Sequence, residues 1–252
     1  MGATLCLAHR GFSGKYPENT LAAFQAAIQV PGCHGFESDV HLSADGEPVI
    51  IHDPVLERTT NGKGFVKDHT FAQLRQLDCG SWFGQKFAGQ QIMHLDELLA
   101  LVLENKLVLN LEVKNYEVFY EGIEEVVIRH IRAAGAQNSV FLSSFNNVAM
   151  EYCKKLDDGI QTGFLYGYPL VDAAGYIGRC KSEALHPRYT CLTYQPQLVQ
   201  QAHAIGKKVN TWTVNTEEDM HFCLNLGVDS IITNYPDVLA TVMENTQKED
   251  RP

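Results

Sequence analysis

The chain alternates short apolar runs with amphipathic stretches along most of its 252 residues. Such runs are typical of strands buried on both faces, as in parallel sheets covered by helices. The runs are Thr4–Ala8, Gly35–Val40, Pro48–Ile51, Leu107–Val113, Ser139–Leu142, Ile160–Leu165, Ala184–His186, Lys208–Val214 and Ser230–Thr233. Repeated strand–helix units predict a parallel sheet with right-handed crossovers. Eight such units in about 250 residues favour a closed (β/α)₈ TIM barrel over an open, doubly wound sheet.

Helical periodicity fills most of the intervals between these runs. The predicted helices include Thr20–Gln29, Leu95–Glu104, Tyr120–Ala134, Val148–Leu156, Gln197–Ala204 and Glu217–Leu226. Asn19 or Thr20 is suited to cap the first of them, and Asn215 or Thr216 the last. No GxGxxG motif follows the first run, which argues against a dinucleotide-binding sheet.

One segment, from about residue 53 to 93, interrupts the alternation. It is rich in Gly, Thr and charged residues, as in Thr59-Thr60-Asn61-Gly62-Lys63-Gly64. We interpret it as a small insertion after the third run, with a short helix over Thr70–Leu77, inside a single barrel domain spanning residues 1–252. The polar tail Thr246–Pro252 is expected to be frayed.

The formal net charge of −10 disfavours nucleic acid and anionic membranes as partners, because such surfaces attract clustered Lys and Arg. A small phosphate ester in a locally positive pocket remains compatible with it. The N-terminus lacks the features of a secretory signal, and no stretch approaches the ~20 apolar residues of a membrane helix. The seven cysteines include no CxxC pair, so we expect reduced thiols in a cytoplasmic protein.

Ionisable residues stand where several apolar runs end, which is where barrel enzymes place their active sites. They are His9, Arg10, Glu37, Asp39, His52, Asp53, Glu112 and Lys114. An ordinary buried strand would carry Val or Ile at such positions. The set therefore predicts a catalytic centre at this end of the barrel.

Glu37 and Asp39 are two residues apart on a predicted strand, so their side chains share one face. Two buried carboxylates repel each other and are costly to desolvate. A divalent cation would offset them, and Glu112 from another strand would add a third oxygen ligand. An all-carboxylate set favours Mg²⁺ or Ca²⁺ over zinc. The alternative is an inert salt-bridge cluster with Arg10 and Lys114.

Cations and imidazoles accompany these acids. Arg10 and Lys114 are suited to bind a phosphate, Arg10 through paired N–H donors of its guanidinium group and Lys114 as a point charge. His9 and His52 are the candidates for proton transfer, because histidine titrates near neutral pH. We expect most of the other eight of the ten histidines to be structural or exposed. Those in loops or helical stretches are His34, His69, His94, His130, His203 and His221.

Five motifs carry a resemblance to a known family. They are Leu7-Ala8-His9-Arg10-Gly11, Pro17-Glu18-Asn19-Thr20, Glu37-Ser38-Asp39-Val40, Val49-Ile50-Ile51-His52-Asp53 and Glu112-Val113-Lys114. In order and spacing they closely resemble the glycerophosphodiester phosphodiesterase family. The similarity runs through most of the chain and includes Trp212-Thr213-Val214-Asn215 near its end.

This resemblance implies a barrel enzyme that hydrolyses glycerophosphodiesters, such as glycerophosphocholine or glycerophosphoethanolamine, to glycerol 3-phosphate and an alcohol. It implies a divalent metal, Mg²⁺ or Ca²⁺, held by Glu37, Asp39 and Glu112. In the same terms His9 and His52 serve as acid and base, and Arg10 and Lys114 contact phosphate.

The resemblance also extends to supporting residues. Glu18 corresponds to the family acid that holds Arg10 or reaches the metal, and Trp212 to an apolar wall beside the glycerol moiety. Two departures are Asn234, where the family often has Asp, and Met93-His94-Leu95, where Pro-Thr-Leu is common. We expect neither to touch the metal, histidine or phosphate groups.

Other functions fit part of the pattern. A lysophospholipase D-like enzyme on the same fold would need an apolar channel or membrane-facing loops, and the chain shows no obvious amphipathic anchor. A metal-dependent sugar isomerase fits the carboxylates but not the paired histidines beside Arg and Lys. A non-catalytic phosphodiester-binding protein would need neither histidine. Open points are the headgroup, the native metal, the nucleophile, which histidine is the base, and the oligomeric state.

Overall fold

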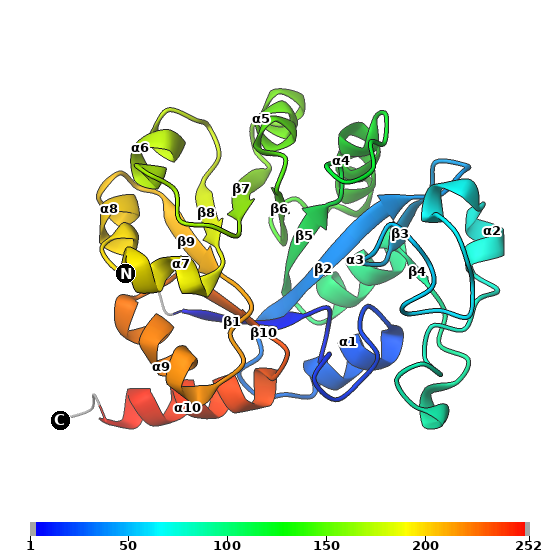
Figure 1. Cartoon of the computed structure of the whole chain (residues 1–252), viewed down its shortest axis with the longest axis horizontal. Helices are drawn as coiled ribbons and strands as arrows, with labels where there is room; N and C mark the ends of the chain where they lie inside the picture. The colour runs from blue at the N-terminus through cyan, green and yellow to red at the C-terminus, as the bar shows by residue number, and fades with distance from the viewer. Residues whose placement is uncertain (1–3, 250–252) are drawn as a thin grey trace.

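A closed barrel of parallel strands forms the centre of the computed structural model, which describes residues 4–249 (Figure 1). Closure comes from β1, which pairs in parallel with both β2 and β10. The barrel strands are β1 (Leu5–His9), β2 (Gly35–Leu42), β5 (Val108–Val113), β6 (Val140–Ser144), β7 (Gln161–Tyr166), β8 (Ala184–Pro187), β9 (Lys208–Thr211) and β10 (Ser230–Thr233). The predicted (β/α)₈ barrel is confirmed.

Helices surround the barrel and connect its strands (Figure 1). They are α1 (Leu21–Ile28), α3 (Leu95–Glu104), α4 (Ile123–Ala134), α5 (Asn147–Leu156), α6 (Ala173–Gly178), α7 (Tyr189–Tyr194), α8 (Leu198–Ala204), α9 (Glu217–Leu226) and α10 (Pro236–Glu249). Thr20 and Thr216 are the N-caps of α1 and α9. The prediction of a frayed tail from residue 246 is wrong as far as Glu249, because α10 continues that far. Residues 250–252 lie outside the described part.

The third apolar run is not a barrel strand, which corrects the prediction for Pro48–Ile51. It forms β3 (Pro48–Ile50), which runs antiparallel to the end of β2 and pairs on its other side with β4 (Met93–His94). Only residues 43–47 separate β2 from β3. A parallel connection needs a crossover of about a dozen residues or more, so this short turn forces the antiparallel arrangement.

Residues 51–92 pack as an appendage beside β3 and have a small apolar core of their own. It consists of Val49, Ile51, Leu56, Val66, Leu74, Cys79 and Ile92. The helix expected over Thr70–Leu77 is the shorter α2 (Phe71–Leu74), capped by Thr70. Two 3₁₀ turns, Val66–Asp68 and Gln85–Phe87, complete the segment. All seven cysteines of the chain carry free thiols, as expected.

Close packing at the start of β2 gives a stability prediction. A Cβ atom at Gly35 would overlap the carbonyl oxygen of Val108 on neighbouring β5. Gly35→Ala is therefore expected to lower the free energy of unfolding by about 2–3 kcal/mol, measured by denaturant titration. Gly167→Ala is the control, because a Cβ there meets no atom within 4 Å. Equal unfolding midpoints for the two variants would contradict the packing argument.

Candidate active site

Three buried carboxylates meet inside the barrel near the carboxyl ends of two adjacent strands. Glu37 and Asp39 lie on β2 and Glu112 lies on β5, where Asp39 and Glu112 are register partners. Each offers an oxygen, and these oxygens lie within 4.8 Å of one another. The structure thus brings together the three acids that the strand spacing pointed to.

Two cations compensate this cluster only in part. Lys114 Nζ lies 2.9 Å from Glu112 Oε1 and 3.1 Å from Asp39 Oδ1, and Arg10 Nε lies 3.3 Å from Asp39 Oδ2. Burial would raise the pKa of Asp39, but the charges of Lys114 and Arg10 hold this pKa well below its usual value. Both cations therefore pair with acids, as the salt-bridge alternative supposed.

Glu37 is the acid that this pairing leaves out. Among residues 4–249, no Lys or Arg nitrogen lies within ion-pair distance of its carboxylate. Burial, and then the charge of Asp39, raise the pKa of Glu37 well above its usual value. Glu37 Oε2 is buried without a hydrogen-bond partner. Such an unpartnered oxygen fits a hard divalent cation better than a closed salt-bridge cluster.

His9 ends β1 and is oriented by the last strand of the barrel. Its Nδ1 lies 2.6 Å from Asn234 Oδ1, and its Nε2 lies 3.7 Å from Glu37 Oε2. The expectation that Asn234 avoids the histidines is therefore wrong. Barrel closure causes this contact, because β1 and β10 pair with Ala8 opposite Thr233. Burial, and then the charge of Arg10, lower the pKa of His9 to about 3, which keeps the imidazole neutral.

His52 follows β3 and has a charged partner instead. Its Nδ1 lies 2.6 Å from Asp53 Oδ1, and Asp53 Oδ2 accepts a 2.6 Å hydrogen bond from Arg58 Nε. Burial would raise the pKa of Asp53, but the hydrogen bonds from Arg58 and His52 lower this pKa to about 2. The buried His41, on β2, contacts the carbonyl oxygen of His52 at 2.9 Å and so fixes the backbone there.

Supporting residues link the two halves of the site. Glu18 Oε1 accepts hydrogen bonds from Arg10 Nη1 at 2.8 Å and from Arg58 Nη2 at 2.7 Å. Asn19 Nδ2 donates to Asp39 Oδ2 at 3.0 Å rather than capping α1. The sequence interpretation missed Arg58 and this role of Asn19. Asn19 had been considered as a helix cap and as part of a family motif, and Arg58, in the polar segment from about residue 53 to 93, had been given no role.

A cavity of about 230 Å³ opens between these groups. It is lined by His9, Arg10, Glu37, His52, Glu112, Lys114, Tyr116, Phe145 and Trp212, among others. The Phe145 ring centre lies 5.1 Å from that of Tyr116 and 5.7 Å from that of Trp212, so the three rings form one wall. Tyr116 also donates a 2.9 Å hydrogen bond to Glu112 Oε1. Tyr116 and Phe145 were missed, although both follow the ends of barrel strands.

A larger cavity, about 340 Å³, lies at the opposite end of the barrel. Its walls include the first residues of several strands, among them Leu5, Val108, Val140 and Gln161. Barrel enzymes use the carboxyl ends of their strands for catalysis, and no histidine is among the described residues that line this larger cavity. The smaller cavity is therefore the candidate active site.

Imidazoles, buried cations and carboxylates that share one cavity at the carboxyl ends of barrel strands define a hydrolase of phosphoric diesters. The sequence model of the glycerophosphoryl diester phosphodiesterase family matches residues 9–238. The chain belongs to this family. No helix among residues 4–249 has the length and apolar character needed to cross a bilayer.

Individual relatives agree with this assignment. The chain is 41% identical over 240 residues to a glycerophosphodiester phosphodiesterase of Caldanaerobacter subterraneus subsp. tengcongensis, covering 95% of this chain and 98% of the relative. A Bacillus altitudinis glycerophosphodiester phosphodiesterase is 35% identical, over 96% and 98% of the two chains. The structure of an Oleispira antarctica phosphodiesterase in complex with the product sn-glycerol-3-phosphate is similar, with a TM-score of 0.87, 33% identity and coverage of 96% and 97%.

Proposed function

We propose that this enzyme hydrolyses glycerophosphodiesters, such as glycerophosphocholine or glycerophosphoethanolamine, to glycerol 3-phosphate and an alcohol. The observation that carries the proposal is the shared cavity of His9, His52, Arg10 and Lys114. The glycerol 3-phosphate bound to the Oleispira relative supports it. Residues 53–93 belong to the same functional unit, since they contribute Asp53 and Arg58 to the site.

Glu37, Asp39 and Glu112 would hold the cofactor, a Mg²⁺ or Ca²⁺ ion. The proposal is supported by their all-oxygen ligand set and by the unpartnered Glu37 Oε2. When bound, the ion would neutralise charge on the phosphate and lower the pKa of a coordinated hydroxyl group. Arg10 and Lys114 line the same cavity and would contact phosphate oxygens. Trp212 would form the apolar wall beside the glycerol moiety.

The partners of the two histidines support different roles for them. His52 Nδ1 contacts the Asp53 carboxylate, which fixes the ring and directs Nε2 to the cavity, so we assign His52 as the general acid. His9 bonds the neutral amide of Asn234 through Nδ1, which leaves Nε2 free to accept a proton. His9 would deprotonate the attacking oxygen, which belongs to water or to a glycerol hydroxyl, as its new bond to phosphorus forms. His52 would protonate the alcohol oxygen as its bond to phosphorus breaks. Where the glycerol hydroxyl attacks, water would then open the resulting cyclic phosphate to give glycerol 3-phosphate.

A second candidate, lysophospholipase D-like hydrolysis, gains support from apolar side chains near the mouth of the barrel. Phe119, Val148, Tyr168 and Val171 follow β5, β6 and β7 on the catalytic side, and each is at least 77% exposed. These side chains were not identified from the sequence, which shows no obvious amphipathic anchor. Exposed apolar groups beside an active site are suited to hold an acyl chain or to rest on a lipid surface.

A comparison of substrates tests both proposals. Release of glycerol 3-phosphate from glycerophosphocholine and glycerophosphoethanolamine is measured beside release of choline from lysophosphatidylcholine, each with Mg²⁺ and with Ca²⁺. We expect the highest kcat/KM with the two water-soluble diesters. Higher kcat/KM with lysophosphatidylcholine would favour the second candidate. Failure to cleave any of the three esters would contradict both.

A further inference from the structure

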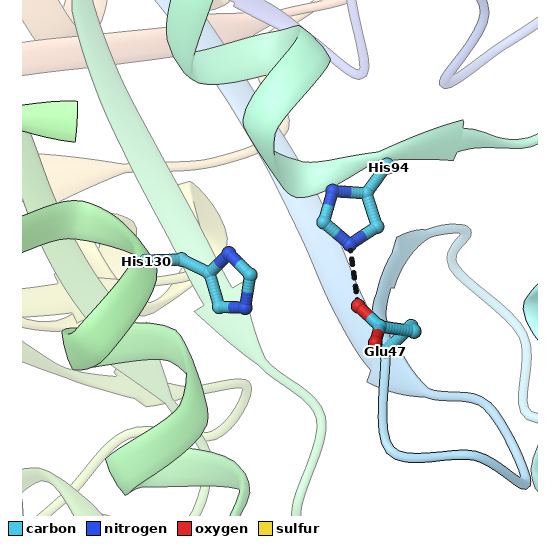
Figure 2. Close-up of side chains that lie close together, drawn as sticks. All are labelled: Glu47, His94 and His130. Carbon is cyan, nitrogen blue, oxygen red and sulfur yellow. Dashed lines mark hydrogen bonds and ion pairs between the residues drawn. The ribbon is translucent and has the colours of Figure 1, made fainter. Parts of the chain in front are cut away.

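A second group of potential metal ligands lies outside the catalytic cavity. Glu47 precedes β3, His94 ends β4 and caps α3, and His130 lies on α4; their ligand atoms are all within 4.8 Å of one another (Figure 2). His94 Nε2 lies 3.1 Å from Glu47 Oε2. The two imidazole centres are 5.4 Å apart. None of the three residues lines the catalytic cavity, and sequence interpretation treated both histidines as structural or exposed.

We propose that Glu47, His94 and His130 form a second metal site that prefers Zn²⁺ or a similar transition ion. Two imidazole nitrogens and one carboxylate are a common ligand set for zinc, whereas Mg²⁺ and Ca²⁺ prefer oxygen alone. The site therefore differs in chemistry from the all-carboxylate set in the barrel. A water molecule would complete a tetrahedral shell.

Asp96 supports both imidazoles from behind. Its Oδ1 lies 2.8 Å from His130 Nδ1, and its Oδ2 lies 3.4 Å from His94 Nδ1. At His130 the carboxylate holds the proton on Nδ1 and leaves Nε2 free for an ion, as is usual for metal-bound histidine. His94 Nδ1 also accepts a 3.2 Å hydrogen bond from the backbone N–H of Asp96, which fixes this ring at the start of α3. Figure 2 shows the His130 ring facing the His94–Glu47 pair. Asp96 thus fixes both rings, His130 through its carboxylate and His94 through its backbone amide.

The cluster is also accessible and adjustable. The side chains of His94 and His130 are only 13% and 17% exposed, whereas that of Glu47 is 46% exposed. Bond lengths of ~2.0–2.1 Å place the ligand atoms of a tetrahedral zinc site roughly 3.3 Å apart. The His94–Glu47 pair already meets this separation. The exposed Glu47 carboxylate can follow the ion while the two packed rings provide a firm base.

An ion at this position would join three separate segments: the turn before β3, the start of α3 and the middle of α4. The appendage of residues 51–92 begins after β3, which Glu47 directly precedes, and ends at β4, which carries His94. The ion would therefore clamp the base of this appendage to the barrel. It would raise the melting temperature, since it binds only the folded chain, and take no part in the hydrolysis.

Zinc titration by calorimetry, with Mg²⁺ in excess, tests the proposal. We expect a saturable Zn²⁺ site in the wild-type chain. Loss of a residue that hydrogen-bonds a metal ligand typically lowers metal affinity roughly 10–100-fold. The Zn²⁺ affinity of His130→Ala and of Glu47→Gln, which change the ligands themselves, should fall by at least that much. The matched control is His203→Ala, because His203 is equally half-buried and pairs with only one carboxylate, that of Asp229. Its Zn²⁺ affinity should equal that of the wild type.

Two further measurements separate metal binding from folding and from catalysis. Zn²⁺ should raise the melting temperature of the wild type and of His203→Ala but not of His130→Ala, and turnover with Mg²⁺ should be the same in all three. If His130→Ala does not fold, Glu47→Gln, in an accessible turn, decides the matter. Equal Zn²⁺ affinity in all variants, or no saturable binding to the wild type, would overturn the proposal and leave the proposed hydrolase function untouched.

Discussion

Alanine at His9 or at His52 is expected to lower kcat/KM for glycerophosphocholine by about 10²–10⁴, the usual contribution of one proton-transfer group. Each ring lines the cavity and has one nitrogen held by a fixed partner, Asn234 or Asp53. Steady-state assays of glycerol 3-phosphate release measure the loss. His203→Ala serves as the control, because that ring lies outside the cavity.

The choice of leaving group distinguishes the two roles. A general acid matters least when the leaving alcohol is already acidic, so a p-nitrophenyl diester should restore most of the activity of His52→Ala. The same ester should not rescue His9→Ala, because a better leaving group does not replace the base that activates the nucleophile. Rescue of His9→Ala alone would reverse the two assignments. Near-native turnover of either variant with glycerophosphocholine would remove that residue from the catalytic mechanism.

Removal of divalent metal is expected to have an effect of similar size. After dialysis against EDTA, turnover should fall by roughly 10³ or more, because a Lewis acid contributes several kcal/mol to charge stabilisation. Mg²⁺ or Ca²⁺ alone should restore it, although EDTA would also strip the Glu47 cluster. Unchanged turnover after chelation would refute the assignment of a metal to Glu37, Asp39 and Glu112.

Glu112→Gln refines this test. The amide keeps the shape of the side chain but provides a weaker ligand, so the Mg²⁺ concentration for half-maximal activity should rise at least roughly tenfold. Glu117→Gln is the matched control, because Glu117 lines the same cavity without belonging to the carboxylate cluster. An equal shift in both variants would mean that general electrostatics, rather than coordination, sets the metal dependence.

Much of the fold could be predicted because the signals are local. Buried parallel strands read as apolar runs. Helices α3 and α9 begin and end at the predicted residues, and α9 is bounded by the caps Thr216 and Gly227. Much of the site was equally accessible. Barrel strands deliver their terminal residues to one rim, so Glu37, Asp39 and Glu112 could be expected to meet before any coordinates were known.

What escaped prediction depends on contacts between distant segments. The apolar run at Pro48 does not encode a strand direction, which the short turn before it decides. Asn234 meets His9 across 225 positions of sequence because the barrel closes. His94 and His130, on separate segments, approach each other only after α3 and α4 pack together. The sequence pattern of neither segment predicts that the two histidines lie close together.

The ionisable groups proposed for bond breaking all come from residues 9–114, whereas most of the exposed apolar surface near the mouth follows β5, β6 and β7. Loops tolerate substitution far better than the strands that support them. Evolution can therefore reshape the surface that meets the non-reacting parts of the substrate without disturbing the reactive atoms. Relatives that keep the early motifs and differ in these loops would catalyse the same reaction on different substrates.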